Sequence, residues 1–286
     1  MSNLIKTYYQ LTKPGIIYGN AITTIAGFFL ASKGHIHFGL FVATLLGISL
    51  VIASACVFNN YIDRDIDDKM ERTKNRALVK KLVPIRNAIL FATILGLVGI
   101  IILILYTNLL TVGVALVGMF FYLVLYSISK RRSIYGTIVG SISGAMPIVG
   151  GYTAVSNRFD SGAFILFLIL VAWQMPHFYA IALYRLGDYT NASIPVLPVR
   201  KGIFVTKIHI VLYILAFLVA SLSLSIFGLT GYIYFVVAAL LGLLWLIFGI
   251  QGFMVKDTRP WARKMFVFSL ITIIVLCIAM SLNAKA

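Results

Sequence analysis

The chain has 286 residues, of which 61% are hydrophobic and only 11% are charged. Soluble domains contain about 45–50% apolar and about 25% charged residues, so this composition excludes an ordinary soluble protein and indicates one that lies in a lipid bilayer. A net charge of +16 would suggest nucleic-acid binding in a soluble protein. In a membrane protein it is typical of basic loops that contact anionic lipid, so we expect membrane lipid and no nucleic acid as a partner.

Long apolar segments follow one another along the whole chain. A membrane-spanning helix needs about 20 mostly apolar residues, and nine segments meet this requirement: residues 14–32, 38–62, 87–106, 109–128, 134–155, 162–184, 206–227, 230–252 and 264–283. No linker or low-complexity tract divides them. We therefore predict an all-α integral membrane protein with a single domain, residues 1–286, in which the first apolar run is retained as a span.

The basic residues alternate between the two ends of the predicted spans. If the N-terminus is cytoplasmic, 21 of the 24 Lys and Arg residues lie in the N-terminal arm or in the loops after the second, fourth, sixth and eighth spans, and the exceptions are Lys33, Arg158 and Lys285. Cytoplasmic loops carry an excess of Lys and Arg. The pattern predicts a cytoplasmic N-terminus and an external C-terminus. The long polar loops after the second and sixth spans place the candidate active face on the cytoplasmic side.

The acidic residues are concentrated at the end of the second span. Five of the eight lie within nine consecutive positions, namely Asp63, Asp65, Asp67, Asp68 and Glu71. Asn59, Asp63 and Asp67 are four residues apart, so a helix would present them on one face. Their hard oxygen atoms suit Mg²⁺ that shares its coordination sphere with a substrate phosphate.

The length of this stretch limits how one ion could be held. Asn59 and Asp67 would lie about 12 Å apart along an unbroken helix. We therefore expect either two metal ions or a helix that breaks near Asp63. The bases Arg72, Lys74 and Arg76 follow directly, and acids for metal beside bases for an anion predict a diphosphate site. The alternative is a solvated helix end with weak Asp–Arg pairs.

Several stretches of the sequence resemble one known family. The segment "FNNYIDRDIDDKMERTKNR" at 58–76 resembles the N-x-x-x-D-x-x-x-D motif of the UbiA superfamily of intramembrane prenyltransferases. Four further stretches resemble the branch of that superfamily that farnesylates heme: "LTKPGIIYGN" at 11–20, "SISKRRSIYGTIVGSISGAMP" at 127–147, "WQMPHFYAIALYR" at 173–185 and "DYTNASIPVLPV" at 188–199. Together they cover nearly the whole chain.

The resemblance implies a fold and an activity. The fold is nine helices around a central cavity with a cytoplasmic polar cap, in the plasma (inner) membrane. The activity is transfer of the farnesyl group of farnesyl diphosphate to a vinyl group of heme B, with addition of water, giving heme O and pyrophosphate. It implies Mg²⁺ as the cofactor. Heme-handling or terminal-oxidase assembly proteins are further partners that this activity would have, and the oligomeric state stays open.

Site residues follow from the same resemblance. Asn59, Asp63 and Asp67 would bind Mg²⁺ and the diphosphate. Asp188 holds the first position of a second aspartate motif, whose second position is Ala192. Whether Asp188 touches metal or orients a base stays open. The other candidates are Arg185 and Tyr189 in this second motif, and Tyr126, Lys130 and Arg131 beside the diphosphate. The division of the cap's cations, Arg132 and Lys201 included, between heme propionates and pyrophosphate also stays open.

His177 lies well inside the predicted sixth span. An ionisable residue at that depth indicates a functional site. It could ligate heme iron or form a hydrogen bond within the helix bundle. Trp173, one turn earlier, is a candidate heme contact, and with Tyr126, Tyr152, Phe178 and Tyr184 it belongs to a set of aromatic rings that could stabilise a farnesyl cation.

The sequence bears on three other functions. An aromatic acid, a quinone precursor or a chlorin could be the acceptor on the same fold, because those branches share the first aspartate motif. A CDP-alcohol phosphotransferase needs D-G-x-x-A-R upstream, and "SLVIASACVFNN" before Asp63 lacks it. A transporter would be expected to show inverted repeats and charges at the membrane midplane, whereas here the charges lie at one face.

Overall fold

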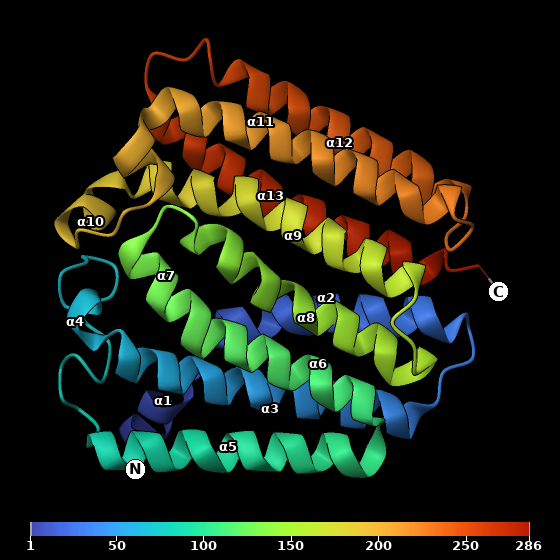
Figure 1. The fold of residues 1–286 in the computed structure, drawn as a ribbon, viewed down its shortest axis with the longest axis horizontal. Coiled ribbons are helices and arrows are strands. Elements are labelled where there is room, and N and C mark those ends of the chain that lie inside the picture. Colours follow the sequence, from blue (N-terminus) through green and yellow to red (C-terminus); the bar gives the residue numbers. More distant parts are fainter. Residues whose placement is uncertain (1, 286) are drawn as a thin grey trace.

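The computed structural model describes residues 2–285 (Figure 1), and within this range its regular secondary structure is helical, with turns and loops between the helices and one isolated β-bridge between Thr230 and Ala284. Nine helices in the described range are long and apolar enough to cross a membrane. They are α2 (Pro14–Ser32), α3 (Phe38–Ile62), α5 (Ile85–Tyr106), the continuous helix α6–η1–α7 (Leu109–Arg132), α8 (Gly136–Ser156), α9 (Ser161–Tyr184), α11 (Leu197–Ile226), α12 (Tyr232–Gln251) and α13 (Thr258–Leu282). The predicted all-α fold and the predicted spans are confirmed.

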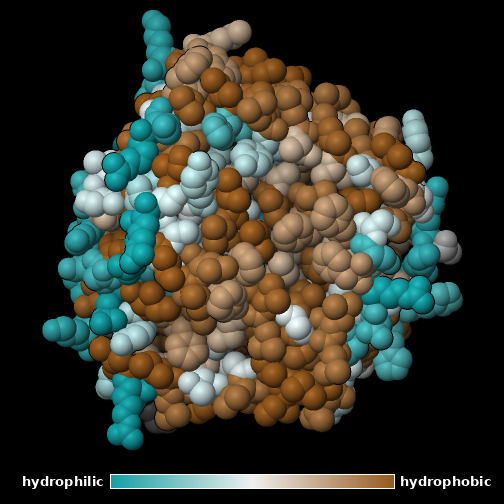
Figure 2. All heavy atoms as spheres, viewed as in Figure 1, coloured by the Kyte–Doolittle hydropathy of each residue, from teal (hydrophilic) through white to brown (hydrophobic). Residues whose placement is uncertain are grey.

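The outer surface of these helices is apolar. Figure 2 shows a broad hydrophobic surface across the middle of the visible face, with hydrophilic side chains gathered at its left and right ends. Large side chains of the spans are exposed, among them Leu105 at 68% and Leu97 at 58%. Exposed apolar area of this extent is favourable only against lipid, so the chain is an integral membrane protein.

Two spans begin earlier than the sequence predicted. Helix α11 begins at Leu197 instead of residue 206, and α13 begins at Thr258 instead of residue 264. Each extension contains two basic residues, so a search for uninterrupted apolar runs ends before it. The start of α11 is also a separate turn, because Gly202 interrupts the helix with φ of 85°.

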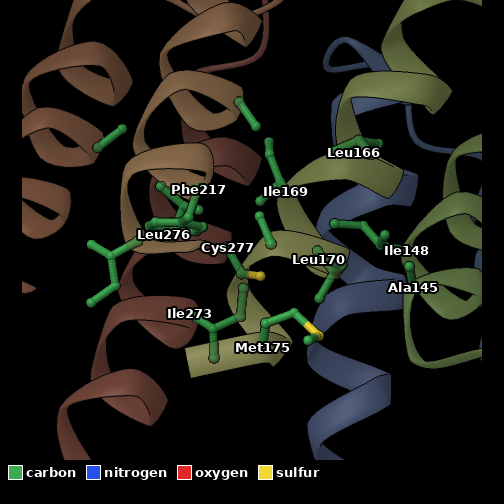
Figure 3. Close-up of a cluster of buried hydrophobic side chains, with 14 of the residues drawn as sticks. Ala145, Ile148, Leu166, Ile169, Leu170, Met175, Phe217, Ile273, Leu276 and Cys277 are labelled. Carbon is green, nitrogen blue, oxygen red and sulfur yellow. The ribbon is translucent and has the colours of Figure 1, made fainter. Parts of the chain in front are cut away.

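The interior is built around α8 and α9. Figure 3 shows buried side chains from α8, α9, α11 and α13 that meet between these helices, including Ile148, Leu170, Phe217 and Leu276. The backbones of α2 and α8 lie in close contact. A Cβ added at Gly27 would lie 2.0 Å from the Ile148 carbonyl oxygen, so only glycine fits there. Small residues at such crossings are how membrane helices pack without a hydrophobic driving force.

The short helices form a cap at one end of the bundle. Helix α4 (Arg64–Asp67) follows α3, and α10 (Leu186–Asn191) follows α9; both lie at the left end in Figure 1, opposite the C-terminus. The two loops pack on each other through Ile66 and Met70 on one side and Ala192 and Ile194 on the other. Helix α1 (Ser2–Leu11) packs against α3. This packing brings the two predicted aspartate motifs to the same end of the molecule.

Candidate active site

The acidic stretch stands where α3 ends. Helix α3 ends at Ile62, and Asp63 (φ −95°, ψ 2°) joins it to α4, so the helix breaks at the predicted position. Asn59, Asp63 and Asp67 are all buried, with exposed fractions of 3%, 6% and 5%. The Asn59 side-chain amide donates to Asp63 Oδ2 at 2.8 Å. A buried carboxylate requires compensating partners, which the next residues supply.

Each of these three side chains is paired with its own cation. Lys13 Nζ donates to Asn59 Oδ1 at 2.6 Å, Lys130 Nζ donates to Asp63 Oδ2, and Arg76 Nη1 donates to Asp67 Oδ2 at 2.5 Å. The cations come from the start of α2, from α7 and from the loop after α4. Lys130 and Arg76 were predicted at the site.

Two residues at the acidic end were missed by the sequence reasoning. The sequence predicts Lys13 only as one of the basic residues on the cytoplasmic side, and it gives no role to Tyr122. The Tyr122 hydroxyl donates to Asn59 Oδ1 at 3.2 Å. Lys13 and Tyr122 are 46 and 63 positions from Asn59, too far for any spacing argument. For Lys13, the stretch "LTKPGIIYGN" was the available signal.

Arg131, predicted beside the diphosphate, contacts the acidic stretch from α7. Its guanidinium donates to both oxygens of Asp65, at 2.7 and 2.8 Å, and to the Ile62 carbonyl at 2.8 Å. It is 3.6 Å from Asp63 Oδ1. Hydrogen bonds from Arg131 lower the pKa of Asp65 to about 2. Arg131 therefore links α7 to α4, and the two nitrogens of its guanidinium group that could bind a phosphate side by side already donate to Asp65.

The remaining predicted cap residues divide into two groups. Lys74 pairs with the exposed Glu71 at 2.7 Å and makes no contact with the buried acids. Tyr189 lies with the second motif: burial raises the pKa of its phenol, and the charges that act on it are those of Arg72, Asp188 and Arg185. Arg72 from the first loop therefore lies near the second motif.

Tyr126 and Lys130 lie on the same face of one helix. Lys130 Nζ is 4.9 Å from the centre of the Tyr126 ring, and Tyr126 stacks on Tyr122 with ring centres 5.8 Å apart. Both tyrosines belong to η1 (Phe121–Tyr126), a π-helical turn between α6 (Leu109–Phe120) and α7 (Ser127–Arg132). Such turns often occur at functional sites.

The donor set fits a magnesium ion. Two carboxylate oxygens, Asp63 Oδ1 and Asp188 Oδ2, are buried without a hydrogen-bond partner. In the part of the chain that the structure describes, no three His, Cys, Asp or Glu side chains gather at one point. Mg²⁺ is usually held by one or two carboxylates, with water and substrate phosphate completing its octahedron. Asn59, Asp63 and Asp67 match that requirement, and they do not match a site built from protein ligands alone.

An apolar cavity of about 370 Å³ lies between the helices. Cys56, one helical turn before Asn59 on α3, lines it together with Tyr122 of η1, and so do Trp173, Gln174 and His177 of α9. Its other lining residues are mostly apolar and come from α2, α3, α6, α8 and α13. Clefts of roughly this size and character are typical ligand sites. The acidic end and the cavity are thus neighbours, joined at Tyr122.

His177 is 8% exposed and has ordered contacts within the bundle. Its Nδ1 lies 2.7 Å from Ser269 Oγ on α13. Trp173 stacks on its ring at 4.8 Å, and the Trp173 indole N–H donates to the Ser269 carbonyl at 2.9 Å. Both predicted heme contacts therefore belong to the cavity wall.

The other aromatic candidates divide differently. Phe178 lines the cavity. Tyr152 does not, because its hydroxyl donates to Asp160 at 3.1 Å, at the N-terminus of α9 and away from the cap. The Tyr184 ring contacts the guanidinium groups of Arg185 and Arg259, whose carbons lie 4.7 and 5.6 Å from its centre.

Comparison with known proteins defines the class. Residues 20–271 match the model of the UbiA prenyltransferase family, and the chain belongs to that family. Relatives from Photorhabdus laumondii and Sodalis glossinidius, each described as protoheme IX farnesyltransferase, are both 55% identical to it; the matches cover 98% of this chain and 96% and 95% of theirs. The family predicted from the sequence motifs is confirmed.

Solved structures share the fold. One described as digeranylgeranylglyceryl phosphate synthase has a TM-score of 0.80 at 19% identity and covers 99% of both chains. A UbiA homologue from Archaeoglobus fulgidus bound to GPP and Mg²⁺ has a TM-score of 0.70 at 13% identity, with 96% of this chain and 99% of that one covered. At these identities the likeness concerns the fold alone.

Proposed function

We propose that this protein is an Mg²⁺-dependent prenyltransferase that transfers the farnesyl group of farnesyl diphosphate to a vinyl group of heme B. Water adds in the same reaction, and the products are heme O and pyrophosphate. The observation that carries the proposal is a buried acid and base cluster directly beside an apolar cavity that contains a histidine. Two relatives with 55% identity, both described as protoheme IX farnesyltransferase, support the choice of acceptor.

The cap residues have the roles that diphosphate release needs. Asn59, Asp63 and Asp67 would hold Mg²⁺, with Asp188 as a further oxygen ligand. When bound, the ion neutralises charge that develops on the departing pyrophosphate. Lys130, Arg76 and Lys13 already lie against the same oxygens, and Arg72 is exposed in the loop above. These cations would hold the diphosphate oxygens and favour their departure.

The cavity would receive the two apolar reactants. The bond between farnesyl C1 and the diphosphate oxygen breaks as C1 bonds to the vinyl group, and the pyrophosphate carries away the electron pair. Water then adds to the electron-deficient vinyl carbon and loses a proton. The apolar lining would keep water from the farnesyl carbon until the vinyl group has reacted, while the Trp173 and Phe178 rings would stabilise positive charge.

The protein would have a defined orientation in the membrane. The cap would face the cytoplasm, with the N-terminus inside and the C-terminus outside the plasma (inner) membrane, because the basic residues gather at the cap end. His177 would contact the heme. The heme product would pass to heme-handling or terminal-oxidase assembly proteins.

One assay tests the activity and the acceptor together. Membranes that contain the overexpressed chain are incubated with heme B, farnesyl diphosphate and Mg²⁺, with and without a chelator, and the extracted hemes are separated with mass detection. A more hydrophobic heme whose appearance requires both Mg²⁺ and farnesyl diphosphate is the expected product. If folded protein forms no new heme, the acceptor is wrong, and an aromatic acid becomes the next one to test.

A further inference from the structure

The contact between α9 and α13 determines which ring nitrogen of His177 carries the proton. We infer that Ser269 is a positioning residue that holds the proton of His177 on Nδ1, so that the lone pair of Nε2 is free for an iron atom in the cavity. The iron-binding role of Nε2 rests on the proposed function, because heme is the proposed substrate. The tautomer itself follows from hydrogen bonds within the protein.

The Ser269 hydroxyl has a single proton to give, and its direction is determined. Ser269 Oγ lies 2.6 Å from the Phe266 carbonyl oxygen. A carbonyl only accepts, so the hydroxyl proton must lie between these two atoms. Were it turned toward His177 instead, two oxygen lone pairs would face each other at hydrogen-bond distance.

The imidazole must therefore donate in the second hydrogen bond. Ser269 Oγ and His177 Nδ1 are 2.7 Å apart, and since the serine proton is already used, Nδ1 carries the hydrogen. The other neighbours of the His177 ring are the aromatic rings of Trp173, Phe178 and Phe266. Within the described residues no carboxylate pairs with the ring, so it is neutral and has one proton. Nε2 then bears a lone pair.

Nε2 is the nitrogen left for a ligand. His177 lines the cavity, and within residues 2–285 its Nε2 has no hydrogen-bond partner. A histidine that binds a metal usually donates its other N–H to a protein oxygen, which fixes the tautomer and the ring orientation. The chain from Phe266 through Ser269 to His177 has this arrangement. A heme iron is the metal that the proposed substrate would bring.

The same serine offers a way to isolate its hydroxyl. Its backbone carbonyl accepts from the Trp173 indole, and that contact survives any change of the side chain. Ser269→Ala therefore removes the two hydrogen bonds of the hydroxyl, to the Phe266 carbonyl and to His177, and keeps the Trp173 contact. Ser269→Thr restores an oxygen at the same position. Ser281→Ala is the matched control, because Ser281 is on the same helix and its hydroxyl donates to a backbone carbonyl, that of Cys277.

The first experiment measures the tautomer without heme. Protein labelled with ¹⁵N-histidine is purified in detergent, and the His177 signals are assigned by their loss in His177→Gln. We expect a protonated Nδ1 and an unprotonated Nε2 in the wild type and in Ser269→Thr. Ser269→Ala should shift the population toward the Nε2–H form. A wild-type Nε2–H tautomer, or an unchanged tautomer in Ser269→Ala, would overturn the inference.

The second experiment adds heme B and records its absorption spectrum. Loss of a hydrogen-bond partner behind a metal ligand typically weakens metal binding by about 10- to 100-fold, so Ser269→Ala should weaken heme binding by about that factor and alter the Soret band. Ser269→Thr and Ser281→Ala should resemble the wild type. If His177→Ala leaves the heme spectrum unchanged, the role of His177 as an iron ligand is overturned, and with it the role of Ser269 in positioning that ligand. The tautomer experiment and the heme O assay would then report separately on the tautomer and on the proposed activity.

Discussion

The acids at the end of α3 have the same chemistry but different surroundings. Asp63 is buried, and one of its oxygens has no hydrogen-bond partner, whereas the Asp65 side chain is 60% exposed and both of its oxygens accept from Arg131. Of these two residues, Asp63 can give an oxygen to a metal without first losing a hydrogen bond, and Asp65 cannot. This difference makes the two residues a matched pair for mutation.

We expect Asp63→Asn to lower the rate of heme O formation by at least about 100-fold, because it removes charge that holds the metal at the leaving group. Asp67→Asn should behave in the same way. Asp65→Asn should lower the rate by less than about tenfold, since it weakens only the Arg131 clamp. Product formation in membranes with equal amounts of folded protein measures this. Equal losses in Asp63→Asn and Asp65→Asn would show that the metal assignment is wrong.

Lys13 makes the stability of the folded protein depend on pH. Burial and the neighbouring Arg76 charge lower the pKa of its ammonium group to about 8, from 10.5. Between these two values the unfolded chain binds more protons than the folded one, so this residue makes the folded state more stable as the pH rises. Below about pH 8 both states are protonated, and the cost of burying the ammonium is present in full.

This sign can be tested by comparing the wild type with Lys13→Met, which has no group to titrate. The midpoint of thermal unfolding in detergent, measured from about pH 7 to about pH 10, should rise in the wild type relative to the variant by a few degrees. Parallel pH profiles of the two proteins would show that the lysine is protonated equally in both states.

At the scale of elements, the crossing of α2 and α8 brings the two backbones close together at two glycines. A Cβ at Gly27 would lie 2.0 Å from the Ile148 carbonyl oxygen, and one at Gly151 would lie 2.1 Å from the Thr24 carbonyl oxygen. Backbone atoms cannot rotate away as a side chain can. The two helices would have to separate, and both line the cavity.

We expect Gly27→Ala to destabilise the protein by about 1–3 kcal/mol or more, the usual cost of overpacking. Gly113→Ala is the control, because no atom lies within 4 Å of a Cβ added there and alanine is the better helix former. It should be neutral or slightly stabilising. Thermal unfolding in detergent measures both, and a Gly27→Ala protein as stable as Gly113→Ala would contradict the close crossing.

The elements also show what the sequence could and could not predict. The apolar spans were predictable because a bilayer of fixed thickness demands a run of fixed length. The π-helical turn at Phe121–Tyr126 was not predicted, since nothing in "FYLVLY" distinguishes it from α-helix. The acids were found by their spacing along one helix. The contacts of Lys13 with Asn59 and of Ser269 with His177 join helices that are distant in sequence, so only packing determines them.

For the molecule as a whole, charge should determine orientation. The cap end contains the two loops that carry the aspartate motifs, and 21 of the 24 basic residues were assigned to that side. The opposite end has the loop between α8 and α9, with Arg158 exposed in it. Because Lys and Arg near the ends of spans are retained in the cytoplasm, the cap end should face inward.

Cysteine labelling tests that orientation directly. Lys80→Cys places a thiol in the exposed loop after α4, and Arg158→Cys places one in the loop at the other end, while the native Cys56 and Cys277 are buried and should stay unlabelled. A maleimide that cannot cross membranes should label Arg158→Cys in intact cells and Lys80→Cys only after the membrane is opened. The reverse pattern would place the cap outside and separate it from a cytoplasmic supply of farnesyl diphosphate. The positive charge of the cap would then need an explanation in diphosphate binding alone.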